Sequence, residues 1–408
     1  MSLRENLDVN RVIYLDCHST TPTDPRVLEA MLPYFTDVFG NPGSHGHVFG
    51  NRARDAVEEA RVTFADGIGA AEDEIVFTGG ATESNNLAIF GTAQRWHGKR
   101  GHLVTIGVEH PSVLEPVRQL EREGWRVSVV PVGQQGSDVS TGHPGVIDLE
   151  ALRSVLSEDT ALVSVSAANH EIGVIQPLRE IAEATHAVGA LLHTDATQAV
   201  GWMPVDMNQW QADLVSFSAH KFNGPKGVGA LYVRRRETYR DARPVRLRPR
   251  TLGGGQEFGF RSGTLNTPGI VGISAALRLA LAEADTQATQ IANLRQRLWG
   301  ALIGQFPDLR LHGPDWQAGG PRLPHNLNFA VPGVEGQTII LRASGVAVSS
   351  GSACSSSTPG VSTVLRAIGL SEDMARSSLR IGLGRFHTAA DMDLAAERLG
   401  EAIRSSRR

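Results

Sequence analysis

Lysine is scarce in this 408-residue chain. Only Lys99, Lys221 and Lys226 are lysines among 39 basic residues, and the last two lie close together within residues 218–227. Arginine keeps its proton in proteins and cannot attack a carbonyl, whereas lysine can. A lysine retained in an arginine-rich chain therefore indicates chemistry that needs a free amine, and a Schiff base is the leading candidate. On spacing alone, a Lys221 that merely closes a turn is about equally compatible.

Cysteine is also scarce, and long apolar runs and a large net charge are missing. Cys17 and Cys354 are the only cysteines, too few for a disulfide framework or a structural zinc site, and they point to a reducing cytoplasm. No apolar run approaches the ~20 residues that span a bilayer, and the N-terminus carries no apolar stretch typical of a secretory signal. A formal net charge of −4 gives no support for nucleic-acid binding. We expect a cytoplasmic protein that binds neither membrane nor nucleic acid.

What is present indicates an α/β fold. Between about residues 70 and 235, short β-branched runs alternate with helical patterns such as 177–188, which predicts a mostly parallel sheet with helices on both faces. The C-terminal part is helical from Ile270 onward and has weaker strands at 325–329 and 346–349, which predicts a smaller α+β domain. We expect a large domain at 21–267 and a small domain formed by 1–20 with 268–408. The strands predicted for the large domain are 74–77, 103–106, 162–165, 190–193 and 214–217.

A glycine turn and a later strand end indicate a phosphate site. Residues 78–86, Thr-Gly-Gly-Ala-Thr-Glu-Ser-Asn-Asn, follow a strand and open a helix, where glycines admit a ligand and unpaired N–H groups can hold a phosphate. An ordinary strand-to-helix turn capped by Thr82 is the alternative. Ser218 and His220, at the end of a later strand, favour the phosphate site. The chain has no Gly-x-x-x-x-Gly-Lys-Ser/Thr motif, which argues against a nucleoside triphosphate.

Polar residues after three other strands complete a pocket. Asp195 ends a strand, where a carboxylate can keep a pyridine nitrogen protonated, although helix capping is also common there. His110 and Asn169 each follow a further strand, and such a histidine could stack on the ring, move a proton or simply belong to a loop. Ligands of such sheets bind beyond the carboxyl ends of the strands. These groups and Lys221 therefore predict one pocket that suits pyridoxal phosphate.

Cys354 is the second candidate for chemistry. It lies in residues 348–360, Val-Ser-Ser-Gly-Ser-Ala-Cys-Ser-Ser-Ser-Thr-Pro-Gly, a stretch rich in glycine and serine. This composition predicts an exposed loop, and an exposed thiolate is a nucleophile. A flexible linker with an incidental cysteine is the alternative. Cys17, by contrast, is typical of a small buried apolar residue.

These motifs, taken in order, resemble a known family. The chain is similar to the cysteine desulfurases, and more narrowly to the long-loop type that supplies sulfur for iron–sulfur clusters, over about residues 14–387. The lysine motif alone is shared by other fold-type I pyridoxal enzymes. The motifs are Tyr14-Leu15-Asp16, Thr20-Thr21-Pro22, Gly40-Asn41-Pro42, Gly80-Ala81-Thr82-Glu83-Ser84, Asn169 with Glu171-Ile172-Gly173, Asp195-Ala196-Thr197-Gln198, Ser218-Ala219-His220-Lys221, Arg261-Ser262-Gly263-Thr264 and Ser350-Gly351-Ser352-Ala353-Cys354.

The resemblance implies a fold-type I pyridoxal enzyme with a seven-stranded sheet, which removes sulfur from L-cysteine and leaves L-alanine and a persulfide on Cys354 for an acceptor protein. It implies that Lys221 forms the Schiff base and moves the α-proton, that Arg380 binds the substrate carboxylate, and that Thr264 reaches the phosphate of the neighbouring subunit in a homodimer. His110 would stack on the ring. The other implied cofactor residues are Ala81, Thr82, Asn169, Asp195, Gln198, Ser218 and His220, with Asn169 and Gln198 near the phenolate oxygen and the substrate carboxylate. No metal site is implied.

Two alternatives stay open at this point. Another pyridoxal enzyme of the same fold, an aminotransferase or a selenocysteine lyase, is the first; Cys354 argues against an aminotransferase only. A non-catalytic scaffold is the second, and the intact Lys221, Asp195 and His110 argue against it. Departures from the family pattern are few: His170 stands where asparagine is common, Gln256 where some members have histidine, and Ala219 where some have glycine.

Residues 234–255 predict a long loop, of which 234–250 is rich in arginine. This arginine-rich stretch either docks an acidic sulfur-acceptor protein, with electrostatics setting the encounter rate, or is simply solvated.

Overall fold

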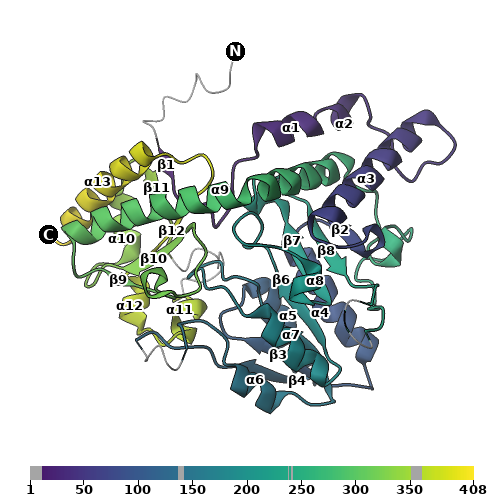
Figure 1. Cartoon of the computed structure of the whole chain (residues 1–408), viewed down its shortest axis with the longest axis horizontal. Helices are drawn as coiled ribbons and strands as arrows, with labels where there is room; N and C mark the ends of the chain where they lie inside the picture. Colours follow the sequence, from purple (N-terminus) through teal and green to yellow (C-terminus); the bar gives the residue numbers. More distant parts are fainter. Residues whose placement is uncertain (1–11, 137–141, 238, 240–241, 351–360) are drawn as a thin grey trace.

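The computed structural model describes residues 12–136, 142–237, 239, 242–350 and 361–408. Its centre is a seven-stranded sheet in the order β2-β8-β7-β6-β5-β3-β4 (Figure 1). Strands β7, β6, β5, β3 and β4 are parallel to one another, and β8 runs antiparallel to both β2 and β7. The strands are β2 (Ile75–Thr78), β3 (His102–Ile106), β4 (Arg126–Val130), β5 (Thr160–Ser164), β6 (Leu191–Asp195), β7 (Leu214–Ser218) and β8 (Gly229–Val233). The predicted α/β fold with a mostly parallel sheet is confirmed.

Helices cover both faces of this sheet. Alternate strand residues point to opposite faces, so that Val215 and Phe217 of β7 join one apolar cluster and Leu214 joins another. Helices α3 (Val48–Gly67), α7 (Leu178–Ala187) and the start of α9 (Thr267–Gln305) bury their apolar side chains in the first cluster. Helices α4 (Ala81–Trp96) and α5 (Pro111–Arg122) bury theirs in the second. The predicted helix 177–188 corresponds to α7.

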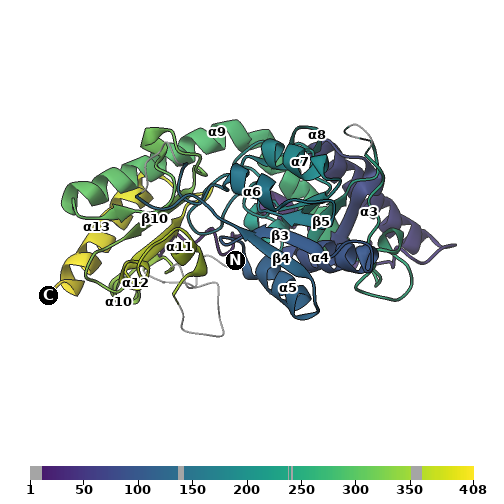
Figure 2. The ribbon, with the colours of Figure 1, turned by 90° about the horizontal axis from the view of Figure 1, so that it is seen from below.

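A smaller α+β unit lies beside the large sheet. It holds a three-stranded antiparallel sheet in the order β12-β10-β9 and a two-stranded parallel sheet of β1 and β11. Helix α9 runs along one side of the molecule and joins the two parts (Figure 2). A separate apolar cluster contains Ile13 and Leu15 of the N-terminal segment together with residues from 291 onward. The elements are β1 (Ile13–Tyr14), β9 (Arg310–Leu311), β10 (Asn326–Ala330), α10 (Gly336–Arg342), β11 (Val346–Ala347), α11 (Thr363–Ala367), α12 (Glu372–Arg376), β12 (Ser378–Gly382) and α13 (Ala389–Ser406).

The division at residues 20 and 267 stays a prediction. The apolar clusters follow it only in part, because Val364 and Leu365 belong to the large cluster and Ala168 and Trp202 to the small one. Helix α9 itself contributes to both: Ile273 and Leu277 lie in the large cluster, and Leu298 and Leu302 lie in the small one. By length and composition alone α9 could also cross a membrane, the one such helix among the described residues, but half of its apolar window is buried inside the protein. Its apolar character is therefore accounted for by packing. Short helices α1 (Pro25–Met31), α2 (Pro33–Thr36), α6 (Leu149–Val155) and α8 (Met207–Trp210) complete the fold.

The described residues of the arginine-rich stretch form no helix or strand, as predicted, but its first arginine, Arg234, is not available to a partner. Arg234 is 1% exposed, and its Nε donates to Oδ1 of the buried Asp213 at 2.8 Å. Arg236 Nε donates to Glu74 Oε2 at 3.0 Å. These arginines therefore hold the end of β8 against the rest of the large sheet. Neither docking nor solvation therefore describes the buried Arg234, while Arg235 and Arg236 are exposed and the choice between the two interpretations stays open for them.

Candidate active site

A cavity of about 830 Å³ lies at the carboxyl ends of the central parallel strands. Asp195 is the last residue of β6, and it pairs in register with Ser216, two residues before the end of β7 at Ser218. The turn after β2, the loops after β3 and β5, and the segment after β7 complete the wall. Eight predicted site residues line it: Ala81, Thr82, His110, Asp195, Gln198, Ser218, His220 and Lys221. The structure therefore brings these eight residues together in one cavity, while their roles stay predictions.

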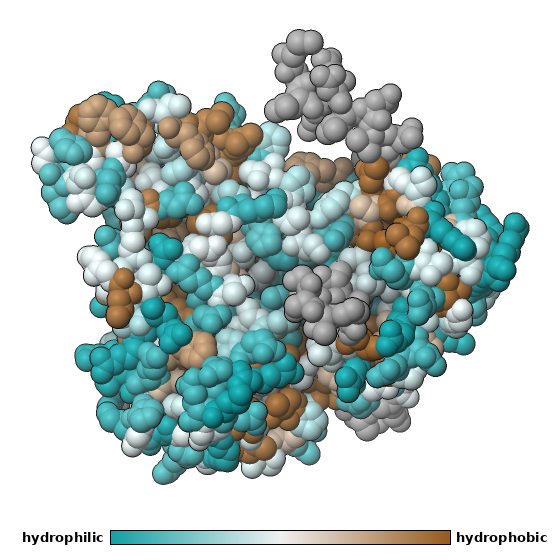
Figure 3. Space-filling view, turned by 180° about the vertical axis from the view of Figure 1, so that it is seen from behind, coloured by the Kyte–Doolittle hydropathy of each residue, from teal (hydrophilic) through white to brown (hydrophobic). Residues whose placement is uncertain are grey.

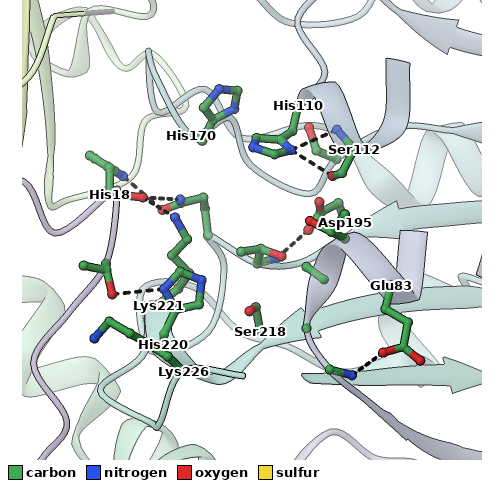
Figure 4. Close-up of a pocket in the computed structure, with 18 of the residues that line it drawn as sticks. His18, Glu83, His110, Ser112, His170, Asp195, Ser218, His220, Lys221 and Lys226 are labelled. Atoms are coloured by element: carbon green, nitrogen blue, oxygen red, sulfur yellow. Dashed lines mark hydrogen bonds between the residues drawn. The ribbon is translucent and has the colours of Figure 1, made fainter. Parts of the chain in front are cut away.

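Lys221 points into this cavity (Figure 4). It ends the short 3₁₀ turn Ala219–Lys221 that follows β7. Its Nζ donates to the backbone carbonyl oxygens of His18 at 2.5 Å and Ser19 at 2.8 Å. Those carbonyls belong to the N-terminal segment, so that a residue of the large sheet is held by a loop leading from β1. The amine lies where a carbonyl compound entering the cavity can reach it.

Asp195 is held rigidly on the opposite side of the cavity. Its Oδ2 accepts a hydrogen bond from Asn85 Nδ2 at 2.8 Å, and its Oδ1 accepts one from the backbone N–H of Thr197 at 2.9 Å. Asn85 also donates to Ser112 Oγ at 2.8 Å, which ties α4 to the start of α5. A carboxylate oriented in this way can pair with a protonated ring nitrogen. Asn85 lies inside a motif that was predicted to bind phosphate, and its role in orienting Asp195 was missed.

His110 is neutral and has a defined tautomer. Its Nδ1 accepts a hydrogen bond from the backbone N–H of Ser112 at 3.1 Å and lies 2.8 Å from Ser112 Oγ, so the ring proton is on Nε2. Burial, with Lys221 and Arg380 nearby, lowers the pKa of His110, while the charge of Asp195 raises it. The ring of His170 meets it edge-on, with centroids 5.1 Å apart. His110 therefore offers a flat ring and one N–H rather than a positive charge.

The glycine turn forms a place for an anion. Gly80 has φ +146°, and a Cβ there would lie 3.6 Å from Ser218 Oγ, so that the backbone before the 16-residue helix α4 approaches the end of β7 closely. His220, whose pKa burial lowers to about 4, is neutral and has Nδ1 3.0 Å from Thr20 Oγ1. Backbone N–H groups at a helix start and neutral side chains of this kind suit a phosphate. With Asp195 and Lys221 on opposite sides of the cavity and the glycine turn in its wall, the residues present fit pyridoxal phosphate.

Three predicted residues lie outside this lining. Asn169 is buried, and its side chain braces a turn: Nδ2 donates to Val108 O at 2.6 Å, and Oδ1 accepts from the N–H groups of Glu171 and Ile172. Arg380 is also buried, beneath His170, whose carbonyl oxygen lies 3.3 Å from Nη1. Its Nη2 donates to Asp16 Oδ1 at 2.9 Å and to Ser19 Oγ at 2.8 Å.

Thr264 is exposed and lines a second cavity, of about 200 Å³, together with Asn41, Gly43 and Gln256. Among the described residues, none lines both cavities. Cys354 lies outside the described residues, between Ser350 and Val361. The predicted roles of Thr264 and Cys354 therefore stay predictions.

Comparison with known proteins agrees with this geometry. The aminotransferase class-V family model matches residues 13–394. A cysteine desulfurase IscS of Rickettsia bellii is 46% identical over 395 residues, covering 97% of this chain and 92% of that protein. A cysteine desulfurase IscS of Anaeromyxobacter sp. is 47% identical over 395 residues, covering 97% and 93%.

Solved structures lead to the same family. A NifS-like protein superposes with a TM-score of 0.86 at 34% identity, covering 96% of this chain and 98% of that one. The apo cysteine desulfurase from Thermococcus onnurineus superposes with a TM-score of 0.81 at 26% identity, covering 99% of each chain. The chain belongs to the aminotransferase class-V family and, within it, to the cysteine desulfurases.

Proposed function

We propose that the protein is a pyridoxal-phosphate-dependent cysteine desulfurase that moves the sulfur of L-cysteine to Cys354 and releases L-alanine. The observation that carries the proposal is the position of Lys221, whose Nζ enters a cavity between Asp195 and the glycine turn. A related solved structure, named SspA in complex with cysteine, is 34% identical with a TM-score of 0.76 over 92% of this chain. The few cysteines support a cytoplasmic location.

Each part of the cavity has a physical role in this activity. Pyridoxal phosphate, when bound, supplies an electron sink for the α-carbon of the amino acid. Asp195 would hold the ring nitrogen in its protonated form, and the N–H groups at the start of α4 would bind the phosphate with Ser218 and His220. Lys221 Nζ would take the α-proton and return it. Arg380, at the base of the site, would bind the substrate carboxylate by paired hydrogen bonds.

The experiment measures sulfide and alanine formed from L-cysteine with a reductant. We expect equimolar products from the unaltered protein and losses of at least about 100-fold in both Lys221→Ala and Cys354→Ala, since each removes a reacting group. Cys17→Ser is the matched control, because burial raises the pKa of the Cys17 thiol to about 12 and keeps it unreactive. Full sulfide release by Cys354→Ala would contradict the proposal, and bound cofactor without sulfide release would indicate a different amino substrate.

We further propose a homodimer. Apolar side chains are exposed on α1, α2 and the beginning of α3, and Figure 3 shows this apolar surface at its upper left. A large apolar patch on a globular protein commonly marks a protein interface. The second cavity, with Thr264, begins beside this surface at Asn41 and Gly43. The exposed residues are Leu28, Leu32, Phe35, Phe39, Val48 and Phe49.

The acceptor would dock on the arginines that remain exposed. Arg246 and Arg248 are exposed, while Val245 and Leu247, which alternate with them, are buried in the sheet cluster. No ion pair holds Arg246 or Arg248 within the described residues. A charge reversal at both positions should slow sulfur transfer to an acidic scaffold protein about tenfold at low salt and leave sulfide release to a reductant unchanged. Equal transfer rates at every salt concentration would remove this surface from the proposal.

A further inference from the structure

His18 connects two residues of the active site and has no assigned role. It follows Cys17 in the loop after β1 and is 1% exposed. Its backbone carbonyl oxygen accepts hydrogen bonds from Lys221 Nζ at 2.5 Å and from Gln198 Nε2 at 3.1 Å. Its ring Nδ1 lies 3.0 Å from Gln198 Oε1. His18 thus contacts the reacting lysine and forms hydrogen bonds with both the oxygen and the nitrogen of the Gln198 amide in the cavity wall.

The neighbours of the His18 ring determine where its proton lies. Asn326 Nδ2 is 3.0 Å from His18 Nε2, and the same amide nitrogen donates to the carbonyl oxygen of Glu171 at 3.0 Å. An amide nitrogen only donates, so His18 Nε2 accepts and the ring proton is on Nδ1. His18 Nδ1–H therefore donates to Gln198 Oε1.

The surroundings of His18 keep this tautomer neutral. Its ring lies 4.4 Å from the ring of His325, which stacks on Trp202 at 4.1 Å. Burial lowers the pKa of His18 well below its ordinary range, and the charged or titrating groups around it, His325, Arg380 and Lys221, lower it further. A second proton on the ring is thus disfavoured at neutral pH.

The hydrogen bonds from His18 fix the orientation of Gln198. With Oε1 bound to the ring and one N–H bound to the His18 carbonyl, the amide cannot rotate by 180° without placing two donors, or two acceptors, against each other. Gln198 lines the cavity, so the amide presents nitrogen rather than oxygen to a bound molecule. We propose that His18 is a positioning residue that holds Gln198 as a hydrogen-bond donor to the phenolate oxygen of pyridoxal phosphate. The inference rests on the proposed cofactor.

The test is the pH titration of the visible absorbance of the purified holoenzyme. A donor to the phenolate stabilises its ionised form, so removing the donor should move the titration midpoint to higher pH by about one unit, a tenfold change in proton affinity. We expect this shift in His18→Leu and in Gln198→Leu, with no further shift in the double variant. His18→Asn should restore the original midpoint, because the asparagine amide nitrogen stands where Nδ1 stands in histidine.

A separate variant controls for changes in the packing around the His18 ring. His325→Phe keeps an aromatic ring against His18 and Trp202 but removes no bond to Gln198, and its midpoint should not move. If His18→Leu does not fold, His18→Phe and Gln198→Leu test the same bond. An unchanged midpoint in the Gln198 and His18 variants, or additive shifts in the double variant, would overturn the proposal. Because the readout requires bound cofactor but no substrate turnover, a holoenzyme with no activity toward L-cysteine would count against the proposed function and not against this role.

Discussion

Glu109 is buried beside the active site, one residue before His110, and takes no part in the proposed chemistry. Its Oε1 accepts hydrogen bonds from the N–H of Ser166 at 2.7 Å and from Ser166 Oγ at 3.0 Å. The described part of the chain offers its Oε2 no hydrogen-bond partner. Burial, with the negative charge of Asp195 nearby, raises the pKa of Glu109 from 4.5 to about 8. The carboxyl group is therefore protonated at neutral pH in the folded protein.

The raised pKa of Glu109 predicts how stability depends on pH. Below about pH 4.5 the group is protonated in both states; as pH rises toward 8, only the unfolded chain releases its proton, and stability is lost until both states are ionised. The glutamine of Glu109→Gln cannot titrate, so the variant does not lose this stability. Its free energy of unfolding relative to that of the unaltered protein should therefore rise by a few kcal/mol between pH 5 and 8.5.

Denaturant unfolding at three pH values measures this difference. Glu115→Gln is the matched control, because Glu115 is exposed on the neighbouring helix. Stability curves that stay parallel for Glu109→Gln would show that Glu109 is ionised in the folded state.

Residues whose chemistry is tied to a strand end could be predicted from the sequence, and residues that orient them could not. Lys221 and Asp195 are reactive types at positions that a parallel sheet brings together. His18 and Asn85 act through hydrogen bonds to partners 180 and 110 positions away along the chain. Nothing in their local sequence distinguishes them from a loop histidine or a helical asparagine, so only the fold reveals them.

At the scale of elements, the 3₁₀ turn Glu257–Gly259 is held by a buried ion pair. Glu257 and Arg61 of α3 have side chains 1% and 3% exposed and form two hydrogen bonds, at 2.7 and 2.9 Å. Glu257 Oε2 also accepts from the backbone N–H of Phe77 in β2 at 2.6 Å. Glu257 and Phe258 both have positive φ, which is strained for residues with a side chain. The ion pair stabilises a turn that its backbone alone disfavours.

Glu257→Gln should destabilise the protein by roughly 3–5 kcal/mol, because it leaves the Arg61 charge buried opposite a neutral group. Chemical denaturation provides the measurement. Glu58→Gln is the control: Glu58 pairs with the same arginine at 3.1 Å, but its side chain is 55% exposed, and a loss below about 1 kcal/mol is expected. If the two variants lose the same stability, burial is not what makes the Glu257 pair strong.

Strands with a clear β-branched, apolar run could be predicted from the sequence. Strands that form because of their pairing with a neighbouring strand could not. The five strands named from β-branched runs correspond to β2, β3, β5, β6 and β7. Strand β4 was missed: it lies at the sheet edge, and only Val130 of its five residues is buried. Strand β8 was also missed, since Gly229 and Ala230 weaken its β pattern; Gly229 fits there because a Cβ would collide with Gly80.

At the scale of the whole molecule, β1 and the loop that follows it connect the active site to the small unit. Strand β1 pairs with β11, and the loop after β1 carries the carbonyl groups that hold Lys221. Arg380 lies on β12 of the small unit and contacts Asp16 and Ser19 in that same loop. The site therefore depends on both units. The sequence predicts that residues 1–20 belong with the small unit, and the pairing of β1 with β11 agrees for the described part, but the sequence does not show that the loop after β1 lies against the lysine.

A substitution at Thr264 tests whether the active site also needs a second copy of the chain. If Thr264 of one subunit binds the phosphate in the other, Thr264→Val should weaken cofactor binding about tenfold, the usual effect of losing one hydrogen bond to a charged group. Lys221→Ala should abolish activity. In a hybrid dimer, the site that keeps Lys221 would then receive an intact Thr264 from the Lys221→Ala subunit.

The Thr264→Val and Lys221→Ala variants are mixed under conditions where the dimers dissociate and re-form and where the cofactor is limiting. The desulfurase activity of the mixture should then exceed the mean activity of the two separate variants. A matched mixture of Lys221→Ala with Asp195→Asn serves as the control, because both changes lie in one cavity of one subunit. In that hybrid, each site retains one defect and no gain is expected. Activity equal to the mean in both mixtures, with hybrid dimers confirmed by mass, would show that Thr264 serves its own subunit or none.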